Sequence, residues 1–241
     1  MRPTQEELSR LYRQMDSEMY ERETAGRIRT ARGNLAIVHR FLRTGCLLDV
    51  GCASGIFLDQ AANAGWQVWG VEPAEGFAGR ARKLLAGRGQ VLHGILEHAS
   101  LPAASFDAVT LWDVLEHVPD PVKFLQLCAS LVKPGGYLFA NVPNLDSLPA
   151  RILGERWPLF LAEHLNYFNR SSLRVIGRLT DMTPVYLGRR FVSFSLSYVF
   201  YRLAQHRIPG SQFGYRLMRR SPLGRLAIPM LFGELCSVWR R

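Results

Sequence analysis

The chain has 241 residues, which is enough for one α/β domain with a substantial core, alone or with a smaller cap. Its apolar content of 48% and charged content of 21% are ordinary for a soluble globular protein. The formal net charge is +10, and residues 202–241 alone carry eight Arg against a single Glu. Basic charge fits nucleic acid, an anionic membrane surface or an anionic substrate equally well, so charge alone predicts none of them.

Sequence features of secreted, membrane-spanning and zinc-binding proteins are missing. Residues 1–44 are charged and lack the apolar segment of a secretory signal. The longest strongly apolar stretch, residues 191–204, contains Arg202 and is too short to span a bilayer. No C-x-x-C pair occurs, so we expect no metal site, reduced thiols and a cytoplasmic location. The cysteines are Cys46, Cys52, Cys128 and Cys236.

Hydrophobic periodicity predicts alternating strands and helices along most of the chain. We expect amphipathic helices within 4–43, strands over 46–50, 68–71, 91–92, 106–112, 137–142 and 184–187, and helices over 56–64, 76–86, 121–131 and 173–180. Ser171 is the expected N-cap of the last helix. This alternation predicts an α/β fold with a doubly wound, mostly parallel, Rossmann-like sheet. An N-terminal helical lid over 1–44 would precede a ligand-binding domain over 45–190, and a basic, apolar extension over 191–241, helical or mixed, would follow.

The most informative segment follows the first predicted strand. Residues 47–55 read Leu-Leu-Asp-Val-Gly-Cys-Ala-Ser-Gly, an apolar run that ends in a turn of small residues. Gly51 and Gly55 keep side chains away from an approaching ligand, and the following helix begins with free backbone N–H groups. The second strand ends in Glu72, twenty-one residues after Gly51. This arrangement predicts a nucleoside pocket at the carboxyl edge of a parallel sheet.

The spacing of the small residues distinguishes between nucleoside ligands. Dinucleotide sites carry G-x-G-x-x-G, whereas this turn reads G-x-A-x-G with Asp49 two residues ahead of it. A carboxylate at Asp49 would repel a pyrophosphate and attract the ammonium and sulfonium groups of S-adenosylmethionine. Glu72 can accept hydrogen bonds from both ribose hydroxyls. The alternative is that Glu72 is a solvated turn residue before Pro73.

At these residues the chain resembles the class I S-adenosylmethionine-dependent methyltransferases, in particular their small-molecule branch of type 11 and type 23. The resemblance covers about residues 46–180. It implies S-adenosyl-L-methionine as cofactor and a small-molecule acceptor, with an oxygen nucleophile on a sugar, polyketide, quinone or lipid-linked compound. The matching motifs are Leu48-Asp49-Val50-Gly51-Cys52-Ala53-Ser54-Gly55, Gly70-Val71-Glu72-Pro73, Ser105-Phe106-Asp107-Ala108-Val109, Asp113-Val114-Leu115-Glu116-His117-Val118 and Leu131-Val132-Lys133-Pro134-Gly135-Gly136.

The same resemblance assigns the cofactor to one set of residues. Ala53 stands where the family often has Gly, and Ile95 where an acidic residue often meets the adenine amine. The adenine contact is therefore expected from the Leu96 backbone, from apolar packing or from Glu97. Trp112 is expected either beside the sulfonium, because aromatic faces attract such cations, or in the core. The predicted cofactor-binding residues are Asp49, Gly51, Cys52, Ala53, Gly55, Glu72, Pro73, Leu96, Glu97, Trp112 and Asp113.

Three residues are catalytic candidates: Asp113, His117 and His164. Methyl transfer needs an aligned nucleophile and exclusion of water, and an oxygen nucleophile usually needs a base as well. Asp113 and His117 follow the fourth predicted strand, one helical turn apart. His164 lies in residues 163–168, after the fifth strand, where the family places substrate-facing elements. For both histidines the alternative is a structural role in holding a loop.

Other functions compete with this prediction. No nucleic-acid partner is expected, since residues 111–114 are not of the D/N-P-P-Y/F type and no Pro-Cys dipeptide or basic aromatic groove is evident. A nicotinamide dehydrogenase is disfavoured by the turn spacing and by Asp49. A non-catalytic cofactor-binding protein or membrane-surface adaptor is motivated by the tail, where aromatic residues within 191–201 stand near Arg side chains. That tail would equally suit an enzyme peripheral to the inner face of a membrane. Nothing in the sequence predicts the oligomeric state.

Overall fold

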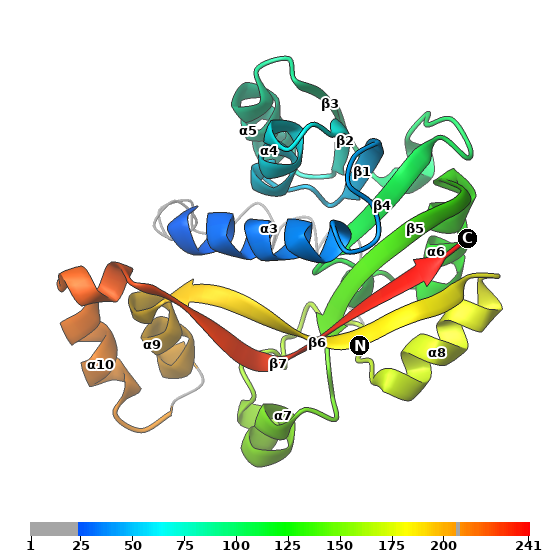
Figure 1. Cartoon of the computed structure of the whole chain (residues 1–241). Helices are drawn as coiled ribbons and strands as arrows, with labels where there is room; N and C mark the ends of the chain where they lie inside the picture. Colours follow the sequence, from blue (N-terminus) through cyan, green and yellow to red (C-terminus); the bar gives the residue numbers. More distant parts are fainter. Residues whose placement is uncertain (1–23, 206–207) are drawn as a thin grey trace.

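The computed structural model describes residues 24–205 and 208–241, which form a sheet flanked by helices (Figure 1). The helical pattern expected from Leu8 to Met19 lies outside these residues. The strands are β1 Cys46–Val50, β2 Gln67–Glu72, β3 Gly89–His93, β4 Phe106–Trp112, β5 Val132–Pro143, β6 Thr183–Ser195 and β7 Ala227–Arg240. The α-helices are α3 Thr24–Val38, α4 Ile56–Asn63, α5 Glu75–Leu85, α6 Pro121–Leu131, α7 Leu148–Leu153, α8 Arg170–Leu179, α9 Leu196–Gln205 and α10 Ser211–Met218. Single 3-10 turns are η1 Leu96–His98, η2 Leu115–His117, η3 Gly154–Arg156 and η4 Pro222–Arg225.

The seven strands of the described chain form one sheet in the order β3-β2-β1-β4-β5-β7-β6. Strands β1 to β5 pair in parallel, whereas β7 runs antiparallel to both of its neighbours. Parallel strands joined by helices place those helices on both faces of the sheet. The predicted α/β class, with a doubly wound and mostly parallel sheet, is therefore confirmed.

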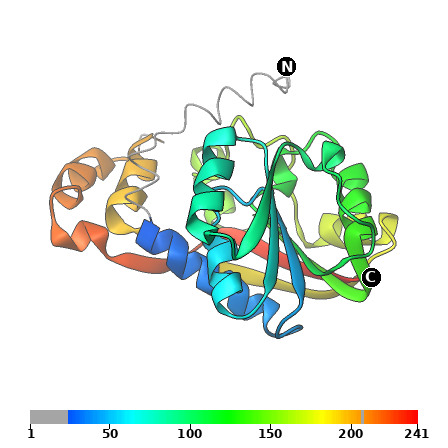
Figure 2. The same cartoon turned by 90° about the horizontal axis from the view of Figure 1, so that it is seen from above.

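Helices cover both faces of the sheet, as Figure 2 shows from above. Leu47 belongs to the core formed with α3, α4 and α5, and the next residue, Leu48, to the core formed with α6 and α8. Both side chains are fully buried. Because successive side chains of a strand point to opposite faces, an apolar run such as 46–50 is what a strand buried on both sides requires.

The ends of some elements differ from the sequence expectation. Asn169, and not Ser171, caps α8: its side chain accepts the Ser172 N–H, and the Ser172 hydroxyl accepts the Asn169 N–H in return. Strand β6 continues past the predicted end at residue 187 to Ser195. Arg189 and Arg190 interrupt the apolar pattern there, but pairing with β7 keeps the backbone extended.

The C-terminal residues complete the sheet. Strand β7 lies between β5 and β6, and β6 crosses the boundary expected at residue 190. The first part of β7, residues 227–233, pairs with β6 alone. This two-stranded ribbon leads to α9 and α10 (Figure 1). The extension is thus mixed, while the expected ranges of lid, domain and extension stay predictions. Helix α3, the described part of the expected lid, lies against α4, β6 and β7.

No helix among the described residues combines the length and the apolar character needed to cross a membrane. Cys46, Cys52, Cys128 and Cys236 form no disulfide with one another.

The turn after β1 approaches α5 closely at Gly55. Gly55 has a φ of 79°, in the left-handed region. A Cβ at this position would lie 2.9 Å from the Cβ and 3.0 Å from the Cα of Ala81. The sequence analysis attributed this glycine to the approach of a ligand. Packing of the turn against α5 is an independent reason for it.

Replacing Gly55 by Ala is expected to lower the free energy of unfolding by about 2–4 kcal/mol, from left-handed strain and from overlap with Ala81. Gly65→Ala is the matched control, because Gly65 has a φ of 89° and no atom within 4 Å of the added Cβ. The control should lose only the strain contribution, about 1–2 kcal/mol. Urea unfolding followed by Trp fluorescence measures both, and equal losses would show that the Ala81 contact is unimportant.

Candidate active site at the carboxyl edge of the sheet

Strand order reverses between β1 and β4, and ligands of open α/β sheets bind beyond the carboxyl ends of the strands at such a point. The turn after β1 begins where the Gly51 N–H donates to the Val71 carbonyl at 2.8 Å. Glu72 is the last residue of β2, and Trp112 is the last residue of β4. The residues expected to bind the cofactor from β1, β2 and β4 therefore lie at one edge of the sheet.

The Glu72 carboxylate connects two turns at this edge. One oxygen accepts the Ala53 N–H at 2.8 Å, and the other accepts the Ala74 N–H at 2.9 Å. The residue is only 7% exposed, and burial raises the pKa of its carboxyl although the two backbone N–H groups oppose this rise. Each carboxylate oxygen has a second lone pair, so Glu72 can still accept two hydroxyl donors of a sugar. This geometry fits a ribose diol.

Asp49 is buried beneath the turn. Its carboxyl accepts the Thr110 hydroxyl at 2.6 Å and is 3% exposed. Burial raises the pKa of Asp49 to about 8, against the opposing effect of the Thr110 hydrogen bond. The group is therefore mostly protonated at neutral pH. An attraction to a cationic ligand requires that Asp49 lose this proton when the ligand binds.

The other turn residues pack within the protein. A Cβ on Gly51 would lie 2.7 Å from the Val114 side chain. Ala53 adopts a φ of 46°, a conformation that glycine reaches more easily. Cys52 is 5% exposed, and burial raises the pKa of its thiol, so it is a packing residue and not a nucleophile.

The cofactor-binding residues predicted between β2 and β4 differ in burial: Leu96 is buried, whereas Pro73 and Glu97 are exposed. Leu96 lies in the core shared with α6, with 4% exposure. Glu97 is exposed and lines a surface pocket with Val118 and Phe124. Pro73 is exposed, and its carbonyl accepts a hydrogen bond from His93 Nε2 at 3.2 Å. The adenine contacts expected from Leu96 and Glu97 stay predictions.

Trp112 and Asp113 lead out of β4. The Trp112 ring meets Phe57 edge-on at 5.4 Å between centroids, and its indole N–H has no hydrogen-bond partner among the described residues. Asp113 has a φ of 59°, and its side chain is 55% exposed. Its N–H donates to the Asn141 Oδ1 at 3.1 Å, and the Asn141 amide donates to its carboxylate. Asp113 is therefore oriented by the protein and accessible to a ligand.

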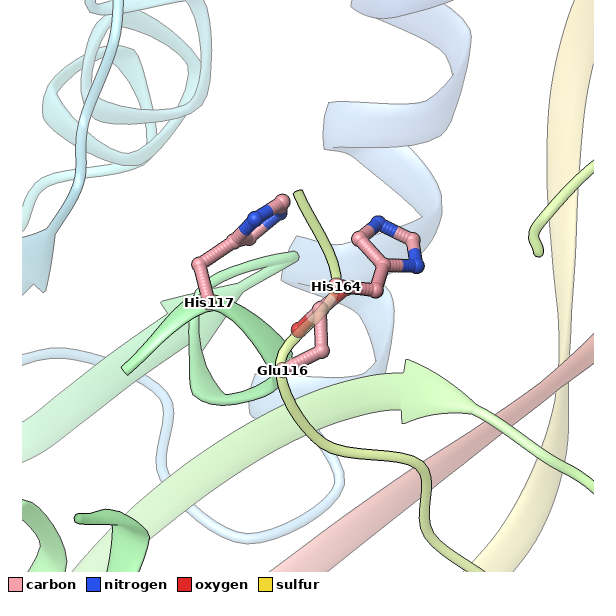
Figure 3. A group of neighbouring side chains, drawn as sticks. All are labelled: Glu116, His117 and His164. Atoms are coloured by element: carbon pink, nitrogen blue, oxygen red, sulfur yellow. The ribbon is translucent and has the colours of Figure 1, made fainter. Parts of the chain in front are cut away.

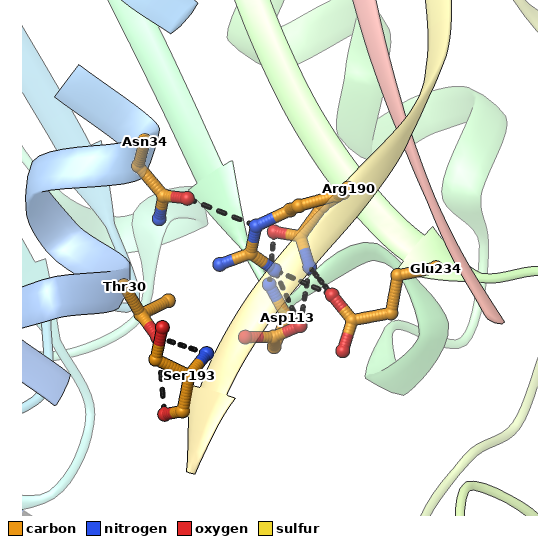
Figure 4. A network of polar contacts seen from close by, with 7 residues as sticks. Thr30, Asn34, Asp113, Arg190, Ser193 and Glu234 are labelled. Atoms are coloured by element: carbon orange, nitrogen blue, oxygen red, sulfur yellow. Dashed lines mark hydrogen bonds and ion pairs between the residues drawn. The ribbon is translucent and has the colours of Figure 1, made fainter. Parts of the chain in front are cut away.

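Arg190 carries a buried positive charge into this edge (Figure 4). Its Nη1 lies 2.6 Å from a Glu234 carboxylate oxygen and 3.6 Å from Asp113 Oδ1, and its Nε donates to Asn34 Oδ1 at 2.9 Å. The guanidinium carbon is 5.5 Å from the centre of the Trp112 ring. The network joins β6 and β7 to the end of β4 and to helix α3. A charge at this depth persists only because it is paired.

Two histidine rings meet beside η2 (Figure 3). The centroids of His117 and His164 are 4.7 Å apart and the rings are nearly perpendicular. His117 Nδ1 bonds the Glu163 carbonyl at 3.0 Å, and His164 Nδ1 bonds the Leu159 carbonyl at 2.9 Å. Because carbonyls only accept, each Nδ1 carries a proton, and each Nε2 of a neutral ring presents a lone pair.

Burial keeps both rings neutral at neutral pH. It lowers the pKa of His117, and it lowers the pKa of His164 to about 4 with a further contribution from His117. Glu116 beneath them is 1% exposed, and burial together with the Asp113 charge raises the pKa of its carboxyl. Glu116 Oε2 has no hydrogen-bond partner among the described residues.

Donor atoms of Glu116, His117 and His164 all lie within 4.8 Å of one another. Carboxylate oxygen and imidazole nitrogen are ligands that zinc accepts. The cluster thus has two chemical capacities, proton transfer and metal ligation. The sequence predicted the first and no metal site, and the absence of a metal stays a prediction.

Asn34, Asn141, Arg190 and Glu234 were not among the residues predicted from the sequence. A signal for two of them was present: Arg190 and Glu234 interrupt apolar runs that become buried strands, and charged residues are rarely buried without a partner. The pairing itself, between residues 44 positions apart, follows from the antiparallel register of β6 and β7.

Comparisons with known proteins agree with this geometry. The family profile described as a methyltransferase domain matches residues 20–186. The chain is 42% identical over 105 residues to the ubiquinone biosynthesis O-methyltransferase of Cronobacter sakazakii, covering 42% of this chain and 43% of that protein. It is 38% identical over 158 residues to the protein of the same name from Bordetella avium, covering 57% and 62%. The chain thus spans about half the length of these curated relatives.

A solved structure shares the fold over almost the whole chain. The S-adenosylmethionine-dependent methyltransferase of Thermotoga maritima superposes with a TM-score of 0.59 at 20% sequence identity. The match covers 93% of this chain and 95% of that one.

Proposed function

The chain belongs to the class I S-adenosylmethionine-dependent methyltransferases, and from this premise we propose that it methylates an oxygen atom of a small-molecule acceptor. The observation that carries the proposal is one sheet edge that holds both an oriented carboxylate, Glu72, and two neutral imidazoles, His117 and His164. The relatives from Cronobacter sakazakii and Bordetella avium are named as O-methyltransferases, which favours oxygen over nitrogen or carbon as the nucleophile.

Carboxylates at the ends of β1 and β2 fit the donor. Glu72 would bind the ribose diol, and Asp49, once deprotonated, would attract the positive charge of the methionine portion. The accessible carboxylate of Asp113 lies at the end of β4, where the methyl group is expected. Bound S-adenosylmethionine supplies an electrophilic methyl group, and the protein's task is then to align the acceptor and to remove its proton.

His164 is the proposed base. Its Nδ1 is held by the Leu159 carbonyl, so its Nε2 can take the proton of an acceptor hydroxyl. His117 donates to the Glu163 carbonyl and orients the loop that carries His164. Burial lowers the pKa of His164, so its Nε2 is unprotonated at neutral pH and can accept a proton, although the lowered pKa also makes it a weaker base than an exposed histidine.

Aromatic side chains around His164 favour a planar acceptor. The rings of Phe160 and Tyr167 stack at 5.0 Å, and the His164 ring lies 5.9 Å from that of Tyr167. Phe160 is 48% exposed and offers its surface to a ligand. Aromatic surfaces bind planar rings well, so we favour a phenol of the quinol type over a sugar.

Glu72→Ala is expected to weaken S-adenosylhomocysteine binding by about 1–3 kcal/mol, because charge-assisted hydrogen bonds to the ribose are lost. Isothermal titration calorimetry measures the loss. The control is Glu75→Ala, at an exposed position of α5, which should bind like the parent. Because Glu72 also holds two backbone N–H groups, circular dichroism must show that the variant is folded. Parental affinity in a folded variant would refute the assigned pocket.

Binding is expected to depend on pH through Asp49. A cationic ligand lowers the pKa of Asp49 from about 8, so the complex holds fewer protons than the free protein and affinity rises with pH up to about 8. Asp49→Asn has nearly the same shape and cannot titrate, so it should lose this rise. S-adenosylmethionine is titrated into both proteins by isothermal calorimetry from about pH 6 to about pH 8. Repeating the titration in buffers of different ionisation enthalpy counts the released proton. Identical pH profiles would show that Asp49 does not release a proton when the ligand binds.

His164→Ala is expected to lower kcat for a quinol-type phenol by about 100-fold or more, the usual contribution of a general base. Affinity for S-adenosylhomocysteine should not change, since His164 is remote from the Glu72 turns in sequence and bonding. Chelation with EDTA should leave the parent's kcat intact if the imidazole acts on the proton and not through a metal ion. Parental turnover of His164→Ala would remove it as the base.

A further inference from the structure

The helical hairpin α9–α10 stands at the far end of the β6–β7 ribbon, away from the central sheet (Figures 1 and 2). The two helices pack on each other: the Tyr201 and Tyr215 rings are 5.5 Å apart, and Phe200 fills the space beside Gly214. Turn η4 contacts both helices. The apolar residues on the inner side of α10 therefore have partners within the hairpin.

Large apolar side chains also cover the outer side of this unit. Phe213 is 74% exposed and Leu217 is 56% exposed, and their spacing of four residues places them on one face of α10. The following turn adds Leu223 at 61% and Leu226 at 52%. Single exposed apolar residues are normal, but four within 14 residues at the tip of a ribbon mark a contact surface.

Arginine side chains alternate with these apolar residues. Arg216, Arg219, Arg220 and Arg225 are all exposed. Residues 191–233 contain six Arg and neither Asp nor Glu. A solvated helix face would mix both signs of charge. This surface, named here the hairpin tip and defined as residues 213–226, is instead apolar and uniformly cationic.

We propose that the hairpin tip docks the protein on an anionic lipid bilayer. Phe213, Leu217 and the leucines of the turn would enter the interfacial layer, and the arginines would meet lipid phosphates, as amphipathic segments of this composition do. Nucleic acid is the other polyanion, but three of the four exposed apolar residues are leucines, which cannot stack on bases. The bilayer is therefore the occupant that accounts for both components of the surface.

Helix α9, which packs against the helix of the hairpin tip, is bonded to the loop that carries His164. Arg202 of α9 donates through Nη2 to the Pro158 carbonyl at 2.7 Å, and the next carbonyl, that of Leu159, holds His164. A protein docked through the hairpin tip would thus hold this loop near the bilayer. The docking inference does not depend on the proposed methyl transfer, and each can fail alone.

Sedimentation of the full-length protein with vesicles tests the inference. Vesicles containing phosphatidylglycerol should carry the protein into the pellet, vesicles of pure phosphatidylcholine should not, and salt should weaken the association. Phe213→Ser with Leu217→Ser, and separately Arg219→Glu with Arg220→Glu, should each reduce partitioning by about tenfold or more. The control is Arg174→Glu with Val175→Ser, which changes an exposed Arg and an exposed apolar residue on α8 and should bind like the parent.

Retained binding of S-adenosylhomocysteine and an unchanged circular dichroism spectrum show that the variants are folded. The inference is overturned if the parent stays in the supernatant with phosphatidylglycerol vesicles, or if both hairpin variants partition like the parent. It is also overturned if duplex DNA or RNA binds the parent and displaces it from vesicles at low concentration, because the surface is then a nucleic-acid site.

Discussion

The hydrogen bonds of the Glu72 carboxylate are the constraint on which the ligand-binding edge depends. They tie the turn after β1, at Ala53, to the turn after β2, at Ala74, so the starts of α4 and α5 are fixed relative to each other. A carboxylate held at both oxygens presents its remaining lone pairs in fixed directions. A sugar diol that binds there has no side chain to order, and preorganisation of this kind increases affinity. The residue that holds the two turns together is therefore the same one that is proposed to bind the ribose.

A second constraint joins the C-terminal strands to this edge. Arg190 from β6 is paired with Glu234 from β7 and bonded to Asn34 from α3, and it approaches Asp113 at the end of β4. Replacing one partner would leave the other charged and buried, which costs about 3–5 kcal/mol in measured cases. Strands β6 and β7 are thus fixed to α3 and to the end of β4 by the contacts of Arg190. Asp113 acquires its orientation from that contact and from Asn141.

Local patterns were sufficient to predict much of the fold. Strand β1, strand β4 and helix α6 occur at the predicted residues, because the strands are mostly apolar and the helix carries its apolar residues at helical spacing. Gly45 lies directly before β1, and Pro121 is the first residue of α6, so both boundaries have a local signal. The course of β7 was not predictable in the same way. Residues 227–240 read equally well as a helix, and only the long-range pairing with β5 and β6 makes them a strand. Arg190 and Glu234 were missed for that reason: their contact exists only in the antiparallel register.

The His164 loop is held from two independent sides. From η2, the Glu116 carbonyl accepts the N–H groups of Leu165 and Asn166 at 2.8 and 3.0 Å. From the hairpin, Arg202 holds Pro158. Glu72 and Asp49 share neither support, because their bonds lie within the turns after β1 and β2 and with Thr110 of β4. The proposed donor side therefore depends on contacts of its own, and the proposed acceptor side depends on contacts with η2 and with α9.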